Sequence, residues 1–178
     1  MLRQIGFSLL ELVVVIAIIS ILVAVALDRL LPYIDEAERV AVLRVEGQLR
    51  STLTMEAAKR IVRGQSASIP GLAGSNPVNF LAQPPTNYVG ALIRPQAAEV
   101  SPRHWYFDEA SRQLVYRLGE AFGLRTSDET MEDPAFTVRV AFADNDGDGR
   151  FEASRDELYG VHLERVAGTR WLAGPRSN

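Results

Sequence analysis

The sequence predicts an α+β protein in which a long N-terminal helix, membrane-spanning in its first half, packs on a small antiparallel β-sheet. Three observations support this prediction: a continuous apolar run near the N-terminus, apolar residues at helical spacing after it, and short alternating segments in the C-terminal half. They divide the chain into a leader at residues 1–6, a transmembrane helix at 7–29, an amphipathic continuation at 30–63 and a globular head at 64–178.

The apolar run extends from Leu12 to Leu27 and is interrupted only by Ser20. With the apolar residues that precede it, a helix from Phe7 to Leu27 would be roughly 30 Å long, which is the hydrocarbon thickness of a bilayer. A helix that is apolar all round has no face for water. We therefore predict that this segment spans a membrane.

Glu11 places a carboxylate within this apolar segment. Such a charge costs roughly 2.5–3.5 kcal/mol at the centre of a membrane helix and less near its end, so Glu11 is a functional candidate. The alternative is a signal peptide or a simple anchor whose glutamate lies at the membrane surface. A signal peptide, however, has a small-residue cleavage site after its apolar core, and none closes this run cleanly.

The residues Gly6-Phe7-Ser8-Leu9-Leu10-Glu11 place a glycine, an aromatic residue and an acid directly before and within the apolar run. This pattern closely resembles the N-terminal processing signal of the type IV pilin superfamily, which includes the pseudopilins of type II secretion. The resemblance covers residues 1 to about 60 strongly, and the head only in its general architecture.

The resemblance implies that a prepilin peptidase cleaves after Gly6 and methylates the new N-terminus at Phe7. It also implies assembly with other pilin or pseudopilin subunits into a helical filament that grows from an inner-membrane platform. A salt bridge between Glu11 and the terminal amine of a neighbouring subunit would lower the cost of both charges in lipid. The molecule would be a ladle in the bacterial inner membrane, with a cytoplasmic N-terminus and a periplasmic head.

After the span, helical spacing continues to Arg63, and Gly64 is placed to cap the helix. We expect Pro32 to kink this helix rather than end it. One stripe of the helix is apolar and is expected to cover the sheet: Ile34, Ala37, Ala41, Val45, Leu49, Leu53 and Ala57.

The segment Gln65–Pro102 is rich in turn residues and is predicted to be an ordered connection with a short helix near Val78–Ala82. Strand signals follow it. The predicted strands are a hairpin of 104–107 and 113–118, a half-buried strand at 136–142 and a last strand at 158–164, which together give a four-stranded antiparallel sheet.

An acidic loop between the last two strands matches the first half of an EF-hand-type calcium loop, D-x-[DN]-x-[DN]-G. Position 12 departs from the pattern, because Arg155 stands where a bidentate glutamate is usual. The alternative is an acidic turn without a metal. The predicted Ca²⁺ ligands are Asp144, Asp146, Asp148, the carbonyl of Arg150, Glu152 and Asp156.

Composition argues against several other functions. The chain contains no cysteine, which excludes disulfides and thiolate sites, and its net charge of −3 gives no basic surface for nucleic acid. The histidines, His104 and His162, fall in predicted strands, and no catalytic motif accompanies them. We therefore expect a protein that is not an enzyme and binds no nucleic acid, with membrane lipid among its partners.

The sequence is most consistent with a structural subunit of a type II secretion pseudopilus, and with a minor pseudopilin in particular. A minor type IV pilin of a surface pilus is the alternative, although many major type IV pilins use a C-terminal cysteine pair that this chain lacks. A membrane-anchored periplasmic enzyme is the remote alternative.

Overall fold

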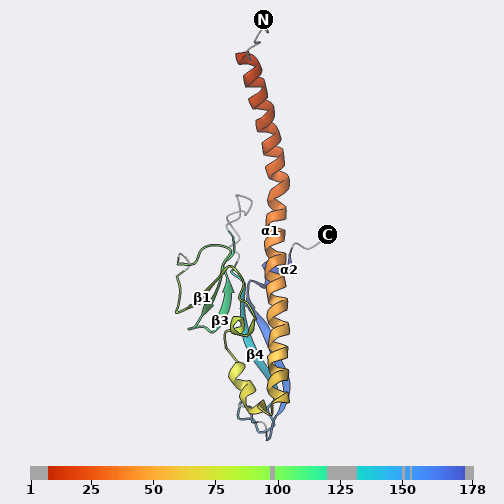
Figure 1. The fold of residues 1–178 in the computed structure, drawn as a ribbon, viewed down its shortest axis with the longest axis vertical. Helices are drawn as coiled ribbons and strands as arrows, with labels where there is room; N and C mark the ends of the chain where they lie inside the picture. The colour runs from red at the N-terminus through yellow and green to blue at the C-terminus, as the bar shows by residue number, and fades with distance from the viewer. Residues whose placement is uncertain (1–7, 97–98, 120–131, 150, 153, 175–178) are drawn as a thin grey trace. The chain divides into compact units, whose positions relative to one another are not determined.

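The computed structural model describes residues 8–96, 99–119, 132–149, 151–152 and 154–174. They divide into two compact units, Met1–Ala37 and Glu38–Asn178, and the first helix runs from one unit into the other. The elements, in chain order (Figure 1), are α1 (Leu9–Val62), the 3₁₀ helices η1 (Ser66–Leu72) and η2 (Pro77–Phe80), the strands β1 (Tyr88–Leu92), β2 (Trp105–Asp108), β3 (Gln113–Tyr116), β4 (Ala135–Ala143) and β5 (Glu157–Ala167), and α2 (Thr169–Ala173).

In the first unit, α1 exposes apolar side chains on every face. The segment Leu9–Leu27 is 19 residues long, and its length and composition are sufficient to cross a membrane. The hydroxyl of Ser20 donates a hydrogen bond to the carbonyl of Ile16 at 2.8 Å, so this polar group is satisfied within the helix. The helix continues through Pro32 without a break, and the predicted kink stays a prediction.

The C-terminus of α1 is closed by the predicted glycine cap. Gly64 has a left-handed φ of +70°, which a residue with a side chain adopts at a cost. The amide of Gly64 donates to the carbonyl of Ile61 at 3.0 Å, and that of Gln65 donates to Arg60 at 2.8 Å. These two bonds form a Schellman motif and satisfy carbonyls that the helix end would otherwise leave unpaired.

In the second unit, one face of α1 packs on the sheet, and it differs in part from the predicted stripe. Leu49, Leu53 and Ala57 are buried as expected. Further toward the N-terminus the buried residues are Val42 and Glu46, whereas Ala41 is exposed and Val45 is half-buried. The prediction was wrong there because the stripe was drawn through apolar residues alone, whereas the buried face includes the carboxylate of Glu46.

The strands form one sheet in the order β1-β2-β3-β4-β5. The predicted hairpin is confirmed, with Trp105 opposite Tyr116 and Phe107 opposite Leu114. The predicted last two strands are also confirmed as the long antiparallel pair β4–β5. The sheet has a fifth strand, β1, which pairs parallel to β2 and which the sequence prediction placed in the connecting region.

The connecting region is more ordered than the prediction of a single short helix. It contains η1 and η2, and η2 at Pro77–Phe80 lies close to the predicted helix. The strands β3 and β4 pair only at Leu114–Phe136 and Val115–Ala135. Beyond that point the amide of Gly74 donates to the carbonyl of Val138 at 2.9 Å, so the loop after η1 takes the place of β3 beside β4.

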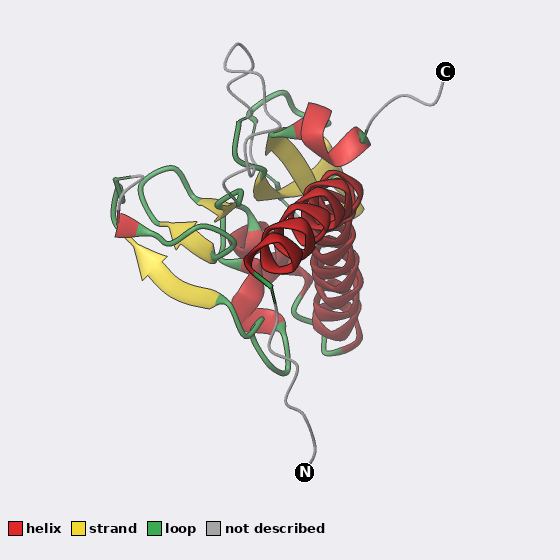
Figure 2. Cartoon of the chain, turned by 90° about the horizontal axis from the view of Figure 1, so that it is seen from above, coloured by secondary structure: helices red, strands yellow, loops and turns green. Residues whose placement is uncertain are grey.

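The core lies between the strands and the part of α1 in the second unit; in Figure 2 the strands curve around one side of the helix. Trp105 is at its centre, with ring centroids 4.9 Å from Tyr116 and 5.9 Å from Phe136. Trp171 on α2 stacks on Tyr116 at 6.4 Å. The short helix α2, absent from the sequence prediction, therefore closes one end of the core.

The helix and the sheet are joined by a buried ion pair. Arg165 on β5 donates two hydrogen bonds to the carboxylate of Glu46 on α1, at 2.8 and 2.7 Å, and Arg50 donates to the same carboxylate at 2.8 Å. The side chain of Glu46 is only 3% exposed. Burial alone would raise the pKa of Glu46, but the hydrogen bonds from Arg165 and Arg50 outweigh it and hold the pKa below its usual value.

A second carboxylate, Glu38, lies two turns earlier on the same face. It accepts a hydrogen bond from the Arg103 guanidinium at 3.0 Å and one from the amide of Gly119 at 2.8 Å. Burial, and then the adjacent Glu38 carboxylate, raise the pKa of Tyr116, so its hydroxyl stays protonated. The helix is thus attached by ionic contacts at Glu38 and Glu46 and by apolar contacts beyond them.

Replacing Glu46 with glutamine should lower the free energy of unfolding by about 3 kcal/mol, because the partly buried Arg165 would lose its charge partner. Chemical denaturation of the full chain in detergent micelles, followed by the fluorescence of the buried Trp105 and Trp171, measures this change. The matched control is Glu164→Gln, which breaks the exposed pair with Arg139 and should cost less than about 1 kcal/mol.

The same pair gives a pH dependence with a defined sign. Because the folded-state pKa of Glu46 lies below its usual value of 4.5, the pair contributes stability above that pH and loses it as the pH falls further. The stability difference between wild type and Glu46→Gln should therefore shrink below about pH 4. An equal effect of Glu46→Gln and Glu164→Gln would contradict a special role for the buried pair.

Candidate functional site

The N-terminal candidate residues lie at the start of α1. Gly6 and Phe7 fall outside the described residues. Ser8 precedes the helix, and its hydroxyl oxygen accepts a hydrogen bond from the amide of Glu11 at 3.1 Å. Ser8 is therefore the N-cap of α1, and Glu11 occupies the third helical position, as in the S-x-x-E capping box. This local role of Glu11 was not part of the sequence prediction, although the spacing signals it.

Glu11 is placed where a negative charge is favoured by the helix itself. It lies in the first turn of α1, at the positive end of the helix dipole. No described residue forms an ion pair with it, and the next charged position along the chain is residue 28. The carboxylate is thus partly stabilised by the helix N-terminus and lacks a cationic partner among the described residues of its own chain.

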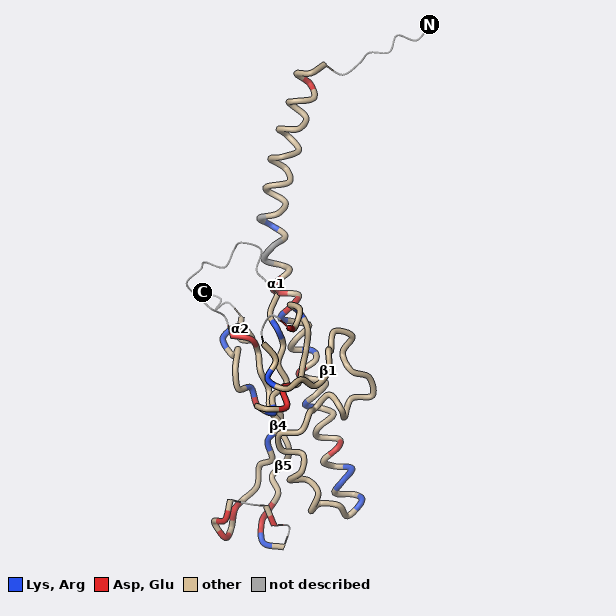
Figure 3. Tube along the Cα trace, turned by 90° about the vertical axis from the view of Figure 1, so that its left-hand side faces the viewer, with Lys and Arg blue, Asp and Glu red and all other residues tan. Residues whose placement is uncertain are grey.

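The acidic loop joins β4 to β5 and gathers negative charge at the lower end of Figure 3. Its fold depends on carboxylates that accept backbone amides. Asp144 accepts hydrogen bonds from Gly147 at 2.7 Å and Gly149 at 2.9 Å. Asp156 accepts from Asn145 at 3.0 Å and Glu152 at 2.7 Å. Each aspartate therefore fixes one arm of the loop.

Three of the predicted metal ligands come together. Asp144, Asp146 and Asp156 each offer a carboxylate oxygen, and these oxygens lie within 4.8 Å of one another. This acidic triad could hold a metal ion. Asp148 and Glu152 are described but do not belong to the triad, and Arg150 lies outside the described residues.

Arg155 lies beside the triad at the position where the EF-hand pattern requires a glutamate. Its guanidinium is 3.1 Å from Asp146 and 3.5 Å from Glu152. The loop thus carries its own cation, which neutralises part of the charge that a metal would otherwise neutralise. A metal ion at this site has to compete with Arg155 for Asp146.

The pKa of Asp144 lies below its usual value of 3.8. The main cause is the hydrogen bond from the amide of Gly149, and the amide of Gly147 adds to it. Asp144 is therefore ionised at neutral pH, which is the state that a hard cation requires.

The two histidines do not take part in either candidate site. His104 precedes β2 rather than lying in it, and its Nδ1 is 2.8 Å from the carbonyl of Pro102. His162 lies on β5 and is exposed. A half-open pocket where β3 and β4 separate was not predicted, because it depends on contacts between segments far apart in the sequence.

Comparison with known proteins identifies the N-terminal segment. Residues 1–27 match the family model described as the prokaryotic N-terminal methylation motif, the type IV pilin-like signal. Comparisons of the chain with curated proteins and with solved structures gave no match. The motif and the apolar helix Leu9–Leu27 together make this a membrane-anchored, pilin-like protein.

Proposed function

We propose that this chain is a structural subunit of a type II secretion pseudopilus, and specifically a minor pseudopilin of the bacterial inner membrane. The observation that carries the proposal is the match of residues 1–27 to the methylation motif, which includes the helix Leu9–Leu27 that is able to span a membrane. The second unit, with its own core of helix and sheet, would be the periplasmic head, and the N-terminus would be cytoplasmic.

In this function the first step is processing by a prepilin peptidase. Cleavage after Gly6 leaves Phe7 as the methylated N-terminal residue, directly before the helix cap at Ser8. Gly6 suits the cleavage position because a residue without a side chain lets the peptide enter a narrow active site in an extended form. The mature chain then begins with a positively charged amine at the membrane surface.

The second step is assembly with other subunits. Glu11 lies in the first turn of α1 and has no ion-pair partner among the described residues. The amine of a neighbouring subunit would supply that partner, and the low dielectric constant of the membrane strengthens the attraction between them. Each charge alone is costly in contact with lipid. Assembly is favourable because it pairs the Glu11 carboxylate with the neighbouring amine and so lowers this cost.

The secretion pseudopilus is favoured over a surface pilus by the absence of cysteine, because many major type IV pilins use a C-terminal cysteine pair. Deletion of the gene, followed by assays of protein secretion and of pilus display in the same strain, tests the choice. Loss of secretion with normal pili supports the pseudopilin, and the opposite result supports a minor type IV pilin. Normal secretion and normal pili together would contradict both.

The acidic loop is proposed to bind one Ca²⁺. The oxygen ligands of the triad Asp144, Asp146 and Asp156 suit a hard cation, and carbonyl oxygens and water would complete the six to eight ligands that calcium takes. Because Arg155 competes for Asp146 and no glutamate stands at position 12, the affinity should be modest, on the order of 10⁻⁴ to 10⁻³ M. Bound calcium would hold the ends of β4 and β5 together.

Changing Gly6 to valine should leave the full-length precursor in the membrane, because the side chain obstructs the peptidase active site. Intact-mass spectrometry of membrane fractions distinguishes the precursor from the processed, methylated chain. In the wild type the expected mass lacks residues 1–6 and includes one methyl group on Phe7. Ser8→Ala, next to the cleavage site, is the control and should be processed normally. Retention of residues 1–6 in the wild type would contradict the proposal.

Changing Glu11 to glutamine should abolish incorporation into filaments while leaving membrane insertion intact. Glutamine can still occupy the third position of a capping box but carries no charge, so this variant separates the ion pair from the helix cap. The control Ser8→Ala removes the cap and keeps the charge, and it should still assemble. Crosslinking between subunits in membranes provides the measurement. Assembly of Glu11→Gln at the wild-type level would show that the charge is not needed.

Calcium at ten times its dissociation constant should stabilise the head by about 1.4 kcal/mol. Thermal unfolding of the full chain in detergent, with EDTA or with millimolar calcium, measures the shift. Asp144→Asn should remove the calcium effect, whereas Arg155→Gln should increase calcium affinity because the competing cation is gone. The control Glu109→Gln removes an exposed carboxylate from a different turn. If calcium changed the unfolding midpoint of neither the wild type nor Arg155→Gln, the loop would be an acidic turn without a metal.

A further inference from the structure

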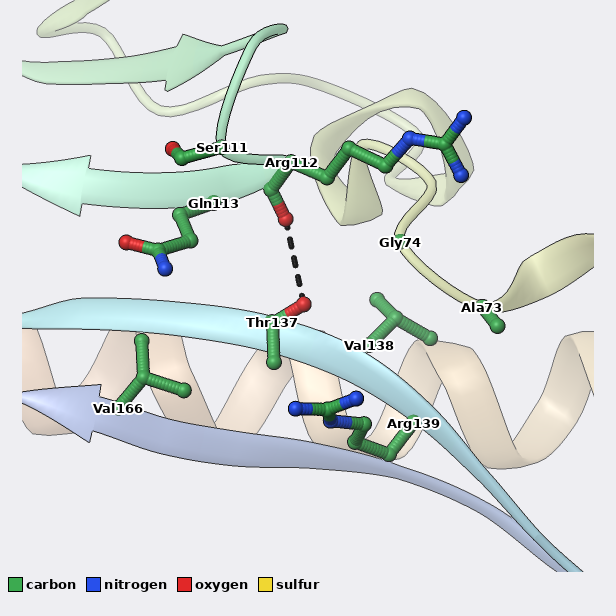
Figure 4. Close-up of a pocket in the computed structure, with 9 residues that line it drawn as sticks. All are labelled: Ala73, Gly74, Ser111, Arg112, Gln113, Thr137, Val138, Arg139 and Val166. Carbon is green, nitrogen blue, oxygen red and sulfur yellow. Dashed lines mark hydrogen bonds between the residues drawn. The ribbon is translucent and has the colours of Figure 1, made fainter.

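A pocket of about 280 Å³ opens where β3 and β4 separate (Figure 4). It lies between the turn that begins β3, the loop after η1 and the strands β4 and β5. The residues that line it include arginine, amide and hydroxyl groups and several small apolar groups, but no acidic residue: Ala73, Gly74, Ser111, Arg112, Gln113, Thr137, Val138, Arg139 and Val166.

Arg112 is held in place by three features of its surroundings. Its carbonyl oxygen accepts a hydrogen bond from the hydroxyl of Thr137 at 3.2 Å, as the dashed line in Figure 4 shows. Its backbone has a left-handed φ of +55°, which is uncommon for a residue with a side chain. Its side chain lies on Gly74, where an added Cβ would be only 2.8 Å from the Arg112 Cδ. The backbone of Arg112 and the first part of its side chain are therefore constrained, and the guanidinium extends past Gly74 (Figure 4).

The pocket offers hydrogen-bond donors that the described residues of the head do not use. Within the described part of the chain, no hydrogen bond or ion pair engages the guanidinium of Arg112 or the side-chain amide of Gln113. Arg139 differs, because Glu164 accepts a hydrogen bond from its Nε at 2.7 Å. One arginine of the pocket is thus neutralised and the other is not.

We propose that this pocket receives the carboxylate of an aspartate or glutamate side chain from a partner protein. The planar guanidinium of Arg112 matches a carboxylate with two parallel hydrogen bonds, and a single unneutralised cation matches a single negative charge. Ala73 and Val138 line the pocket on the side toward which the Arg112 guanidinium extends (Figure 4), and the aliphatic stem of the side chain would occupy the space beside them. The proposal does not depend on whether the chain joins a secretion pseudopilus or a surface pilus.

A carboxylate carried by a protein suits the pocket better than a free anion. The volume exceeds what one carboxylate needs, and the pocket is open on one side, so a small ion would stay largely hydrated. A side chain that enters through the opening brings its stem and its backbone into contact with the apolar part of the lining. Those contacts add affinity that acetate cannot gain.

The test is a titration of the full chain in detergent micelles, labelled with ¹⁵N at arginine. The probes are a capped pentapeptide with a central glutamate, the same peptide with glutamine in its place, and acetate. The Nε–Hε signal of Arg112, assigned by its loss in Arg112→Lys, should shift with the glutamate peptide. The glutamine peptide should bind about tenfold more weakly, as expected when one charge-assisted contact is lost.

Arg112→Gln should reduce binding of the glutamate peptide to the level of the glutamine peptide. Arg94→Gln is the matched control, because Arg94 is also an exposed arginine with positive φ but lies outside the pocket. Unfolding curves equal to wild type establish that each variant is folded. Equal binding of the two peptides, equal effects of the two variants, or acetate binding as tight as the glutamate peptide would each overturn the proposal.

Discussion

The bidentate ion pair between Glu46 and Arg165 fixes how α1 lies on the sheet. The two residues are 119 positions apart in sequence, and each guanidinium hydrogen bond has a defined direction. Apolar contacts such as those of Leu49 and Leu53 have no direction, so they allow a helix to slide or rotate at small cost. The carboxylate at Glu46, together with Glu38 two turns earlier, makes one rotation and one position of the helix much more favourable than the others.

Most of the fold was predictable because its signals are local. Alternating apolar residues predicted β4, aromatic residues predicted β2, and Gly64 predicted the end of α1. The strand β1 was missed because its central residue is Gly90 and because a parallel pair has no short turn to announce it. The burial of Glu46 was missed for a different reason. A charged residue is buried in a core only when a partner of opposite charge is present, and Arg165 is too distant in sequence for periodicity to reveal this pairing.

The candidate sites differ in how far sequence reasoning could reach. The signal around Gly6, Phe7 and Glu11 is contiguous, so its chemistry could be inferred without a fold. In the acidic loop the predicted ligands Asp144, Asp146 and Asp156 come together, whereas the predicted ligand Asp148 lies outside this triad. The pairing of Ala143 with Glu157 places the two ends of the loop opposite each other, and this explains why Asp156 joins Asp144. The register of β4 and β5 therefore supplies the geometric reason why Asp156, which the sequence prediction included as a ligand, belongs to the triad.

The long separation of Glu46 from Arg165 also sets an order for folding during synthesis. When α1 leaves the ribosome, the residues that will cover its buried face belong to strands that have not yet been made. Neighbouring strands of the sheet follow one another in sequence, so the sheet can grow strand by strand from β1. Arg165 and Trp171 arrive last. Until then the helix presents Leu49, Leu53 and a Glu46 carboxylate paired only with Arg50 to water, so completion of the head depends on β5 and α2.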